Sequence, residues 1–150
     1  MRRPHVRRGG QLSPSGRSGT SHVPDGACST TVLCPCGTGR PEDTCCAPVL
    51  AGRPAATAEA LMRSRYTAFV RGDRAYLLAS WHPSTRPRRL RLEPGSVWTG
   101  LEIVARSGGT MFSADGTVEF RAHRTDGVLA ERSRFVREDG RWFYVDGDVE

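Results

Sequence analysis

Residues 116–127 read GTVEFRAHRTDG, and this segment decides the fold. Apolar side chains alternate with charged ones along residues 116–124, which gives one apolar and one polar face with the two-residue period of a β-strand. The strand is followed by Asp126-Gly127, a pair that favours a tight hairpin turn. The segment therefore predicts a half-buried strand that reverses direction at its end.

The same alternation occurs on both sides of this strand. We predict further strands over 97–104, 128–138 and 141–146, and Asp139-Gly140 forms a second tight turn between the last two. Neighbouring strands joined by such turns form an antiparallel meander.

The residues before the strands have a helical period instead. Thr57 is followed by Ala-Glu-Ala, as at a capped helix start, and apolar residues then recur every three or four positions, which predicts a helix over 57–71. Asp73 can cap a second helix over 74–81. Helices followed by a run of strands indicate an α+β fold, with the helices on one face of the sheet.

Four cysteines lie within a short segment ahead of the helices: Cys34, Cys36, Cys45 and Cys46. Four thiolates form a closed tetrahedral zinc site with no position open to water, which indicates a structural Zn²⁺. So short a segment has no core of its own, and metal ligation is the only interaction strong enough to order it. The spacing differs from the usual separation of zinc ligands, so a redox pair or a cluster of small buried side chains is the alternative. Cys28 is left over as an unligated thiol.

The chain has a formal net charge of +6, and all 22 of its basic residues are arginine. Five of these lie in residues 1–30, which are rich in Gly, Ser and Pro and contain few aliphatic residues. We predict that residues 1–31 are disordered, or that the natural start of the chain lies downstream of Met1. Most of the excess charge lies in this tail, so it argues little for nucleic-acid binding.

No segment approaches the about 20 apolar residues of a membrane span, and the arginine pairs near Met1 are not followed by the apolar core of an export signal. We therefore expect a cytoplasmic protein. In a reducing compartment its five cysteines favour metal or redox chemistry over disulfides.

The cysteine segment resembles the SEC-C motif, the zinc knuckle also found at the tail of the SecA translocation motor. Further segments resemble the YchJ-like family: LMRSRYTAF (61–69), WHPSTRP (81–87), ERSRF (131–135) and GRWFYVDG (140–147). The resemblance implies a zinc knuckle over 32–50, followed over 51–150 by a domain similar to nuclear transport factor 2. That domain is a cone in which a curved sheet wraps over helices.

The resemblance and the cysteines together imply a zinc-binding interaction protein. We expect the knuckle to dock to a protein or ribosomal partner and the cone to hold a small apolar ligand or a second subunit. The chain would then act as a monomer or a homodimer.

An enzyme of the isomerase or hydrolase type is the first alternative, because cone folds often enclose a pocket. The pocket candidates are Tyr66, His82, Glu131, Tyr144 and Asp146. A competing interpretation assigns the aromatic candidates to the core. It treats several arginines as ion-paired supports of the fold: Arg63, Arg65, Arg132 and Arg134.

RNA binding is the second alternative. Four arginines fall between residues 86 and 91 and could contact phosphates: Arg86, Arg88, Arg89 and Arg91. The segment has no interleaved aromatic residues, so a solvated loop is the simpler interpretation.

Overall fold

The computed structural model describes residues 31–150, and the predictions for the preceding tail and for Cys28 lie outside the described residues. The helical elements are η1 (Glu42–Thr44), α1 (Cys46–Leu50), α2 (Ala58–Arg71) and α3 (Arg74–Ala79). The strands are β1 (Trp98–Gly108), β2 (Asp115–Arg124), β3 (Gly127–Glu138) and β4 (Arg141–Val149).

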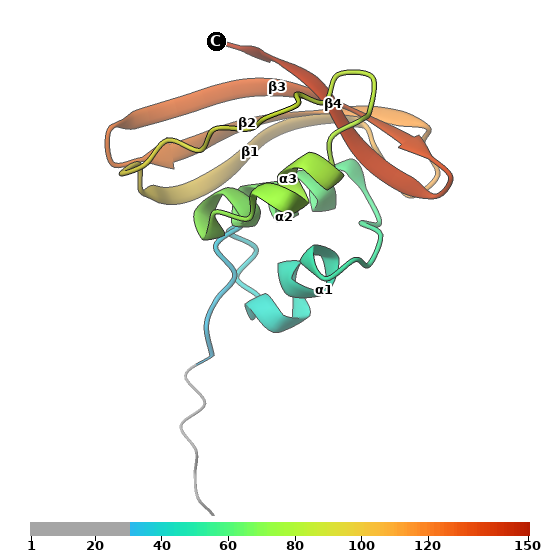
Figure 1. Ribbon diagram of the computed structural model, residues 1–150. Coiled ribbons are helices and arrows are strands. Elements are labelled where there is room, and N and C mark those ends of the chain that lie inside the picture. Colours follow the sequence, from blue (N-terminus) through green and yellow to red (C-terminus); the bar gives the residue numbers. More distant parts are fainter. Residues whose placement is uncertain (1–30) are drawn as a thin grey trace, which may run out of the picture. The chain divides into compact units, whose positions relative to one another are not determined.

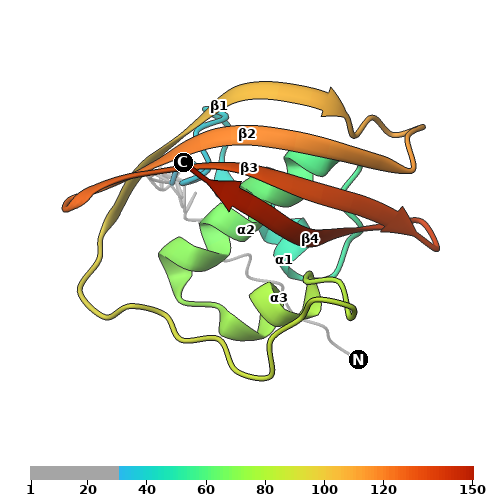
Figure 2. The same ribbon diagram turned by 90° about the horizontal axis from the view of Figure 1, so that it is seen from above.

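The four strands form one antiparallel sheet in the order β1-β2-β3-β4. The sheet curves over α2 and α3, which cover one of its faces (Figures 1 and 2). This arrangement confirms the predicted α+β fold with a curved antiparallel sheet on helices. None of the helices within residues 31–150 has the length and apolar character needed to cross a membrane.

The helix boundaries follow the local signals in the sequence. The Thr57 side chain accepts a hydrogen bond from a backbone N–H of the first turn of α2, and Gly72 ends the helix with a left-handed φ of 69°. The Asp73 carboxylate caps α3 in the same way. Helix α3 ends at Ala79, before the predicted end at residue 81, because Trp81 already bridges to β4.

Strand β4 is longer than predicted and contains an irregularity. Phe135 of β3 pairs with Tyr144, whereas the preceding residue, Arg134, pairs with Asp146, so Val145 is an extra residue in the ladder. Such a β-bulge interrupts the alternation of faces. Because paired residues share a face, Tyr144 faces the helices with Phe135, and Asp146 faces away from them with Arg134.

The cysteine segment packs against the rest of the fold. Cys34, Cys36 and Cys46 belong to the same buried cluster as side chains of α2 and the sheet. Residues 46–50 form the short helix α1. Figure 1 shows α1 on the side of α2 opposite the sheet.

Candidate metal centre and ligand cavity

The four cysteines of the knuckle converge on one point. Their Sγ atoms all lie within 4.8 Å of one another, and the Sγ atoms of Cys36 and Cys45 are 3.5 Å apart. Gly37 and Gly39 have φ values of 84° and 77°, which glycine adopts without steric cost, and they turn the chain back between the two pairs of cysteines. The four thiols are thus close enough to hold one metal ion.

Hydroxyl and guanidinium groups surround the sulfur atoms. Thr67 Oγ1 of α2 lies 3.6 Å from Cys34 Sγ, and Thr38 Oγ1 lies 3.2 Å from Cys45 Sγ. Arg40 Nη2 donates a hydrogen bond of 3.6 Å to Cys45 Sγ. Contacts of this kind orient the ligands of a metal ion, and the guanidinium would offset the negative charge of four thiolates around such an ion.

The donor set fits Zn²⁺. Thiolates at about 2.3 Å from the ion would be separated by about 3.8 Å at the edges of a tetrahedron, close to the observed spacing. The cluster also divides its protons unevenly. A hydrogen bond with Cys46 lowers the pKa of Cys36 to about 4, whereas burial raises the pKa of Cys34.

A second feature is a cavity of about 570 Å³ under the concave face of the sheet. One wall is α2, another is the segment between α3 and β1, and the roof is formed by β1 to β4. Apolar and aromatic side chains line most of it: Met62, Tyr66, Phe69, Trp98, Phe120 and Leu129. A volume of this size suits a small molecule.

The cavity has a polar end on β3 and β4. The carboxylate of Glu131 accepts hydrogen bonds from Ser133 Oγ at 2.8 Å and from Tyr144 Oη at 3.0 Å. Burial, followed by the charge of Glu131, raises the pKa of the Tyr144 phenol, which therefore stays protonated. All three side chains line the cavity.

Arg65 of α2 lines the same end. Its Nη1 donates to the carbonyl of Leu77 at 2.8 Å and to Ser80 Oγ at 2.7 Å. Its Cζ lies 4.5 Å from the ring centre of Tyr144 and 5.3 Å from that of Trp81. Burial lowers the pKa of Arg65 to about 10, which leaves it charged at neutral pH.

Residues 57–147 match the family model described as YchJ, middle NTF2-like domain. The chain belongs to the YchJ family. It is 57% identical to a UPF0225 protein of Streptomyces coelicolor over 79% of this chain and 96% of that one. It is 50% identical to a UPF0225 protein of Chromobacterium violaceum over 77% of this chain and 92% of that one.

Two solved structures also resemble this YchJ-family chain. A SEC-C motif containing protein from Rhodopseudomonas palustris has a TM-score of 0.67 at 34% identity, covering 79% of this chain and 99% of its own. A SEC-C motif containing protein from Psychrobacter arcticus has a TM-score of 0.63 at 29% identity, and the match covers 79% of this chain and 82% of that one. These matches confirm the resemblance to the YchJ-like family and to SEC-C proteins.

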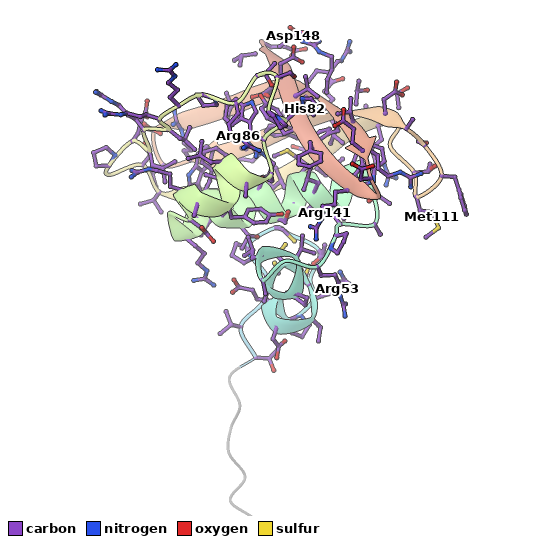
Figure 3. The ribbon with its side chains drawn as sticks, turned by 45° about the vertical axis from the view of Figure 1, so that its right-hand side comes forward. Arg53, His82, Arg86, Met111, Arg141 and Asp148 are labelled. Atoms are coloured by element: carbon purple, nitrogen blue, oxygen red, sulfur yellow. The ribbon has the colours of Figure 1, made fainter. Side chains whose placement is uncertain are left out.

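The YchJ-family cavity brings together three of the five predicted pocket residues. Tyr66, Glu131 and Tyr144 line it. His82 is not among the lining residues. It lies in the loop after α3, beside β4 (Figure 3), and its Nε2 lies 2.9 Å from Glu138 Oε1.

Asp146 is likewise not among the residues that line the cavity. Plain alternation places it on the same face as Tyr144, but the bulge at Val145 turns it to the outer face, where it pairs with Arg134 at 2.5 Å. Arg134 is therefore ion-paired, with Asp146 and also with Asp148.

Arg65 lines the cavity but was not among the predicted pocket residues. It was interpreted as an ion-paired support, but within residues 31–150 its hydrogen bonds go to a carbonyl and a hydroxyl. It lies four residues after Leu61 and four before Phe69, in the middle of an apolar helix stripe. That position was the available signal that its side chain is buried.

The arginine-rich segment of the YchJ-family chain forms one edge of the cavity. Leu90 and Leu92 line the cavity between arginines. Arg86 donates to the Trp81 carbonyl at 2.8 Å, whereas Arg88 and Arg89 are exposed. The segment thus serves as a wall whose arginines mainly face solvent.

Proposed function

We propose that this YchJ-family protein binds a small, largely apolar molecule in its cone cavity, and that a zinc knuckle fixes the helix that forms one wall of the site. The observation that supports this function is the cavity of about 570 Å³, lined by aromatic and aliphatic side chains and closed at one end by a hydrogen-bonded polar cluster. Small-molecule sites have this composition.

The zinc knuckle supports the cavity through α2. Thr67 and Arg63, four residues apart, face the knuckle: Thr67 contacts Cys34 Sγ, and Arg63 Nη1 donates to the Cys36 carbonyl at 2.5 Å. Met62 and Tyr66, on the neighbouring stripe, line the cavity. Four thiolates leave no open coordination position, so the ion supplies structural stability to this wall.

The outer side of the knuckle supports a second role, docking to a protein or ribosomal partner in the cytoplasm. Three residues of this side are exposed and polar, namely Thr38, Arg40 and Thr44. The inner side is occupied by α2. A partner would therefore approach from the side away from the sheet.

The enzyme hypothesis retains Tyr66, Glu131 and Tyr144 and loses His82 and Asp146. A carboxylate held by two hydroxyls beside a cavity can accept a proton from a bound substrate. Ligand binding is the proposal that all of these residues support, and turnover would require a substrate proton within reach of Glu131.

Two measurements on the purified protein test this function. Elemental analysis is expected to give one zinc per chain, and a fragment screen by NMR is expected to shift signals of cavity residues. Leu129→Trp, which fills the cavity, should abolish these shifts, and Val128→Trp, at the exposed neighbouring position, should preserve them. Binding that survives Leu129→Trp, or protein that folds fully without metal, would refute the proposal.

A further inference from the structure

Arg65 is the only charged residue that is fully buried among residues 31–150, with 3% of its surface exposed. A buried charge is costly unless it is paired and hydrogen-bonded. The contacts of Arg65 satisfy only part of its guanidinium. Nη1 makes two hydrogen bonds, to Leu77 and Ser80, whereas Nε and Nη2 make none with the part of the chain that the structure describes.

The unpaired groups form one edge of the guanidinium. Nε–H and one N–H of Nη2 point in parallel, and this edge matches the two oxygens of a carboxylate. Arg65 also lines the cavity. A buried cation therefore presents a two-pronged donor in a cavity whose remaining walls are mostly apolar.

The charge of Arg65 is not neutralised by a direct ion pair within the described residues. Glu131 lines the same cavity, but its Oε1 accepts hydrogen bonds from Ser133 and Tyr144. The rings of Tyr144 and Trp81 lie against the guanidinium and hold its plane in place. The free edge is therefore open to a hydrogen-bond acceptor that enters the cavity, either water or a ligand.

We propose that the cavity binds a small organic carboxylate, with the carboxylate on the Nε and Nη2 edge of Arg65 and an apolar body against Tyr66, Phe69 and Trp98. This proposal rests on the proposed ligand-binding function and adds the chemical class of the ligand. Three further arginines line the cavity: Arg71, Arg91 and Arg124. Arg71 pairs with Glu42 and Arg124 with Glu93, so the planar fork of the buried Arg65 is the donor assigned to the carboxylate.

The test compares matched pairs of probes: 3-phenylpropionate with 3-phenylpropionamide, and 2-naphthoate with 2-naphthamide. Calorimetry gives the affinities, and tryptophan emission reports on the cavity because Trp81 and Trp98 line it. Each carboxylate is expected to bind roughly tenfold or more tightly than its amide, which is the effect of a charge-assisted bidentate hydrogen bond.

Two variants assign this preference to the polar end. Arg65→Lys keeps the positive charge but removes the paired Nε and Nη2 donors, so the preference for carboxylates over amides should fall severalfold. Arg132→Lys is the matched control, because Arg132 is an exposed residue of β3 paired with Glu119. Glu131→Gln leaves every contact of Arg65 in place and removes a nearby negative charge, so carboxylates should bind more tightly while amides are unaffected.

The outcomes separate the two proposals. If carboxylates and amides bind equally, the cavity binds ligands but the carboxylate inference is wrong. If none of the four probes binds, the proposed function and the inference both fail for ligands of this size. If Arg65→Lys does not fold, Glu131→Gln decides: unchanged carboxylate affinity would overturn the inference.

Discussion

Among single residues, Gly147 leaves the space that the Glu131 side chain occupies at the polar end of the cavity. A Cβ atom at this position would lie 1.9 Å from Glu131 Oε1. The carboxylate can therefore lie over the bare backbone of β4, where Ser133 and Tyr144 donate hydrogen bonds to it. The position of Glu131 depends on the absence of a neighbouring side chain.

Gly147→Ala is expected to lower the free energy of unfolding by about 1–3 kcal/mol, the usual cost of forcing an extra methyl group into a packed site. Gly100→Ala is the control, because a Cβ atom there meets nothing within 4 Å. Urea denaturation measures both. Adding Glu131→Ala to Gly147→Ala should recover part of the loss, and equal losses for the two glycine variants would contradict this explanation.

Tyr144 is expected to make the free energy of unfolding fall as the pH rises above about 10. Burial and Glu131 raise the pKa of its phenol in the folded state above the value of about 10 for an unfolded chain. The folded state then holds a proton that the unfolded state releases. The resulting stability is complete below about pH 10 and is lost as pH rises through the folded-state pKa.

Tyr144→Phe should therefore flatten the loss of stability between about pH 10 and pH 12, while costing about 1 kcal/mol at neutral pH through the lost hydrogen bond to Glu131. Urea midpoints measured across this range provide the test. Tyr66 and Tyr76 also have raised pKa values, so a residual slope is expected in the variant. A slope identical to that of the unmodified protein would contradict the assignment.

Among the elements, α2 connects the two sites. One of its stripes contacts the knuckle through Arg63 and Thr67, and Arg71 at the next position of that stripe pairs with Glu42 of η1. The neighbouring stripe lines the cavity. The helix therefore contacts both the cysteine cluster and the cavity.

Thr67→Val tests the contact between α2 and the knuckle. Loss of the hydroxyl next to Cys34 Sγ is expected to weaken zinc binding roughly tenfold, as for other second-shell partners of metal ligands. Competition with a chromogenic chelator measures the affinity. Thr99→Val, at an exposed position of β1, should leave it unchanged. An unchanged affinity in Thr67→Val would show that this contact does not support the metal site.

The parts of the fold that local signals specify could be predicted from the sequence. Thr57, Gly72 and Asp73 mark helix ends, and both Asp-Gly pairs mark turns. The bulge at Val145 could not be predicted, because it depends on pairing with β3 and leaves no signal in β4 itself. This matters for the candidate site, because the extra residue places Asp146 on the opposite face of the sheet from Tyr144.

Across the whole molecule, residues 31–150 share one core. The buried cluster includes Cys34, Cys36 and Cys46 together with Tyr66, Phe120 and Trp142 of the cone. A knuckle with a separate core would unfold on its own. The shared core predicts that the metal site and the sheet unfold together.

Thermal unfolding should accordingly show one transition by three probes: far-ultraviolet circular dichroism, tryptophan emission and zinc release to a dye. Removal of zinc with a chelator is expected to lower the midpoint by roughly 10–20 °C for the entire transition. Cys46→Ser should do the same, and Cys28→Ser should not. Zinc release well below the loss of circular dichroism would show instead that the knuckle is an independent unit.

A helix shared by two sites places them in one thermodynamic cycle. A bound ion that stabilises the position of α2 would also stabilise the wall of the cavity. Reciprocity would then require an occupant of the cavity to increase the affinity for the ion by the same factor. Oxidants that remove the metal from the cysteine thiolates would thus weaken ligand binding in the cavity. A bound ligand would in turn protect the cysteines from losing the metal.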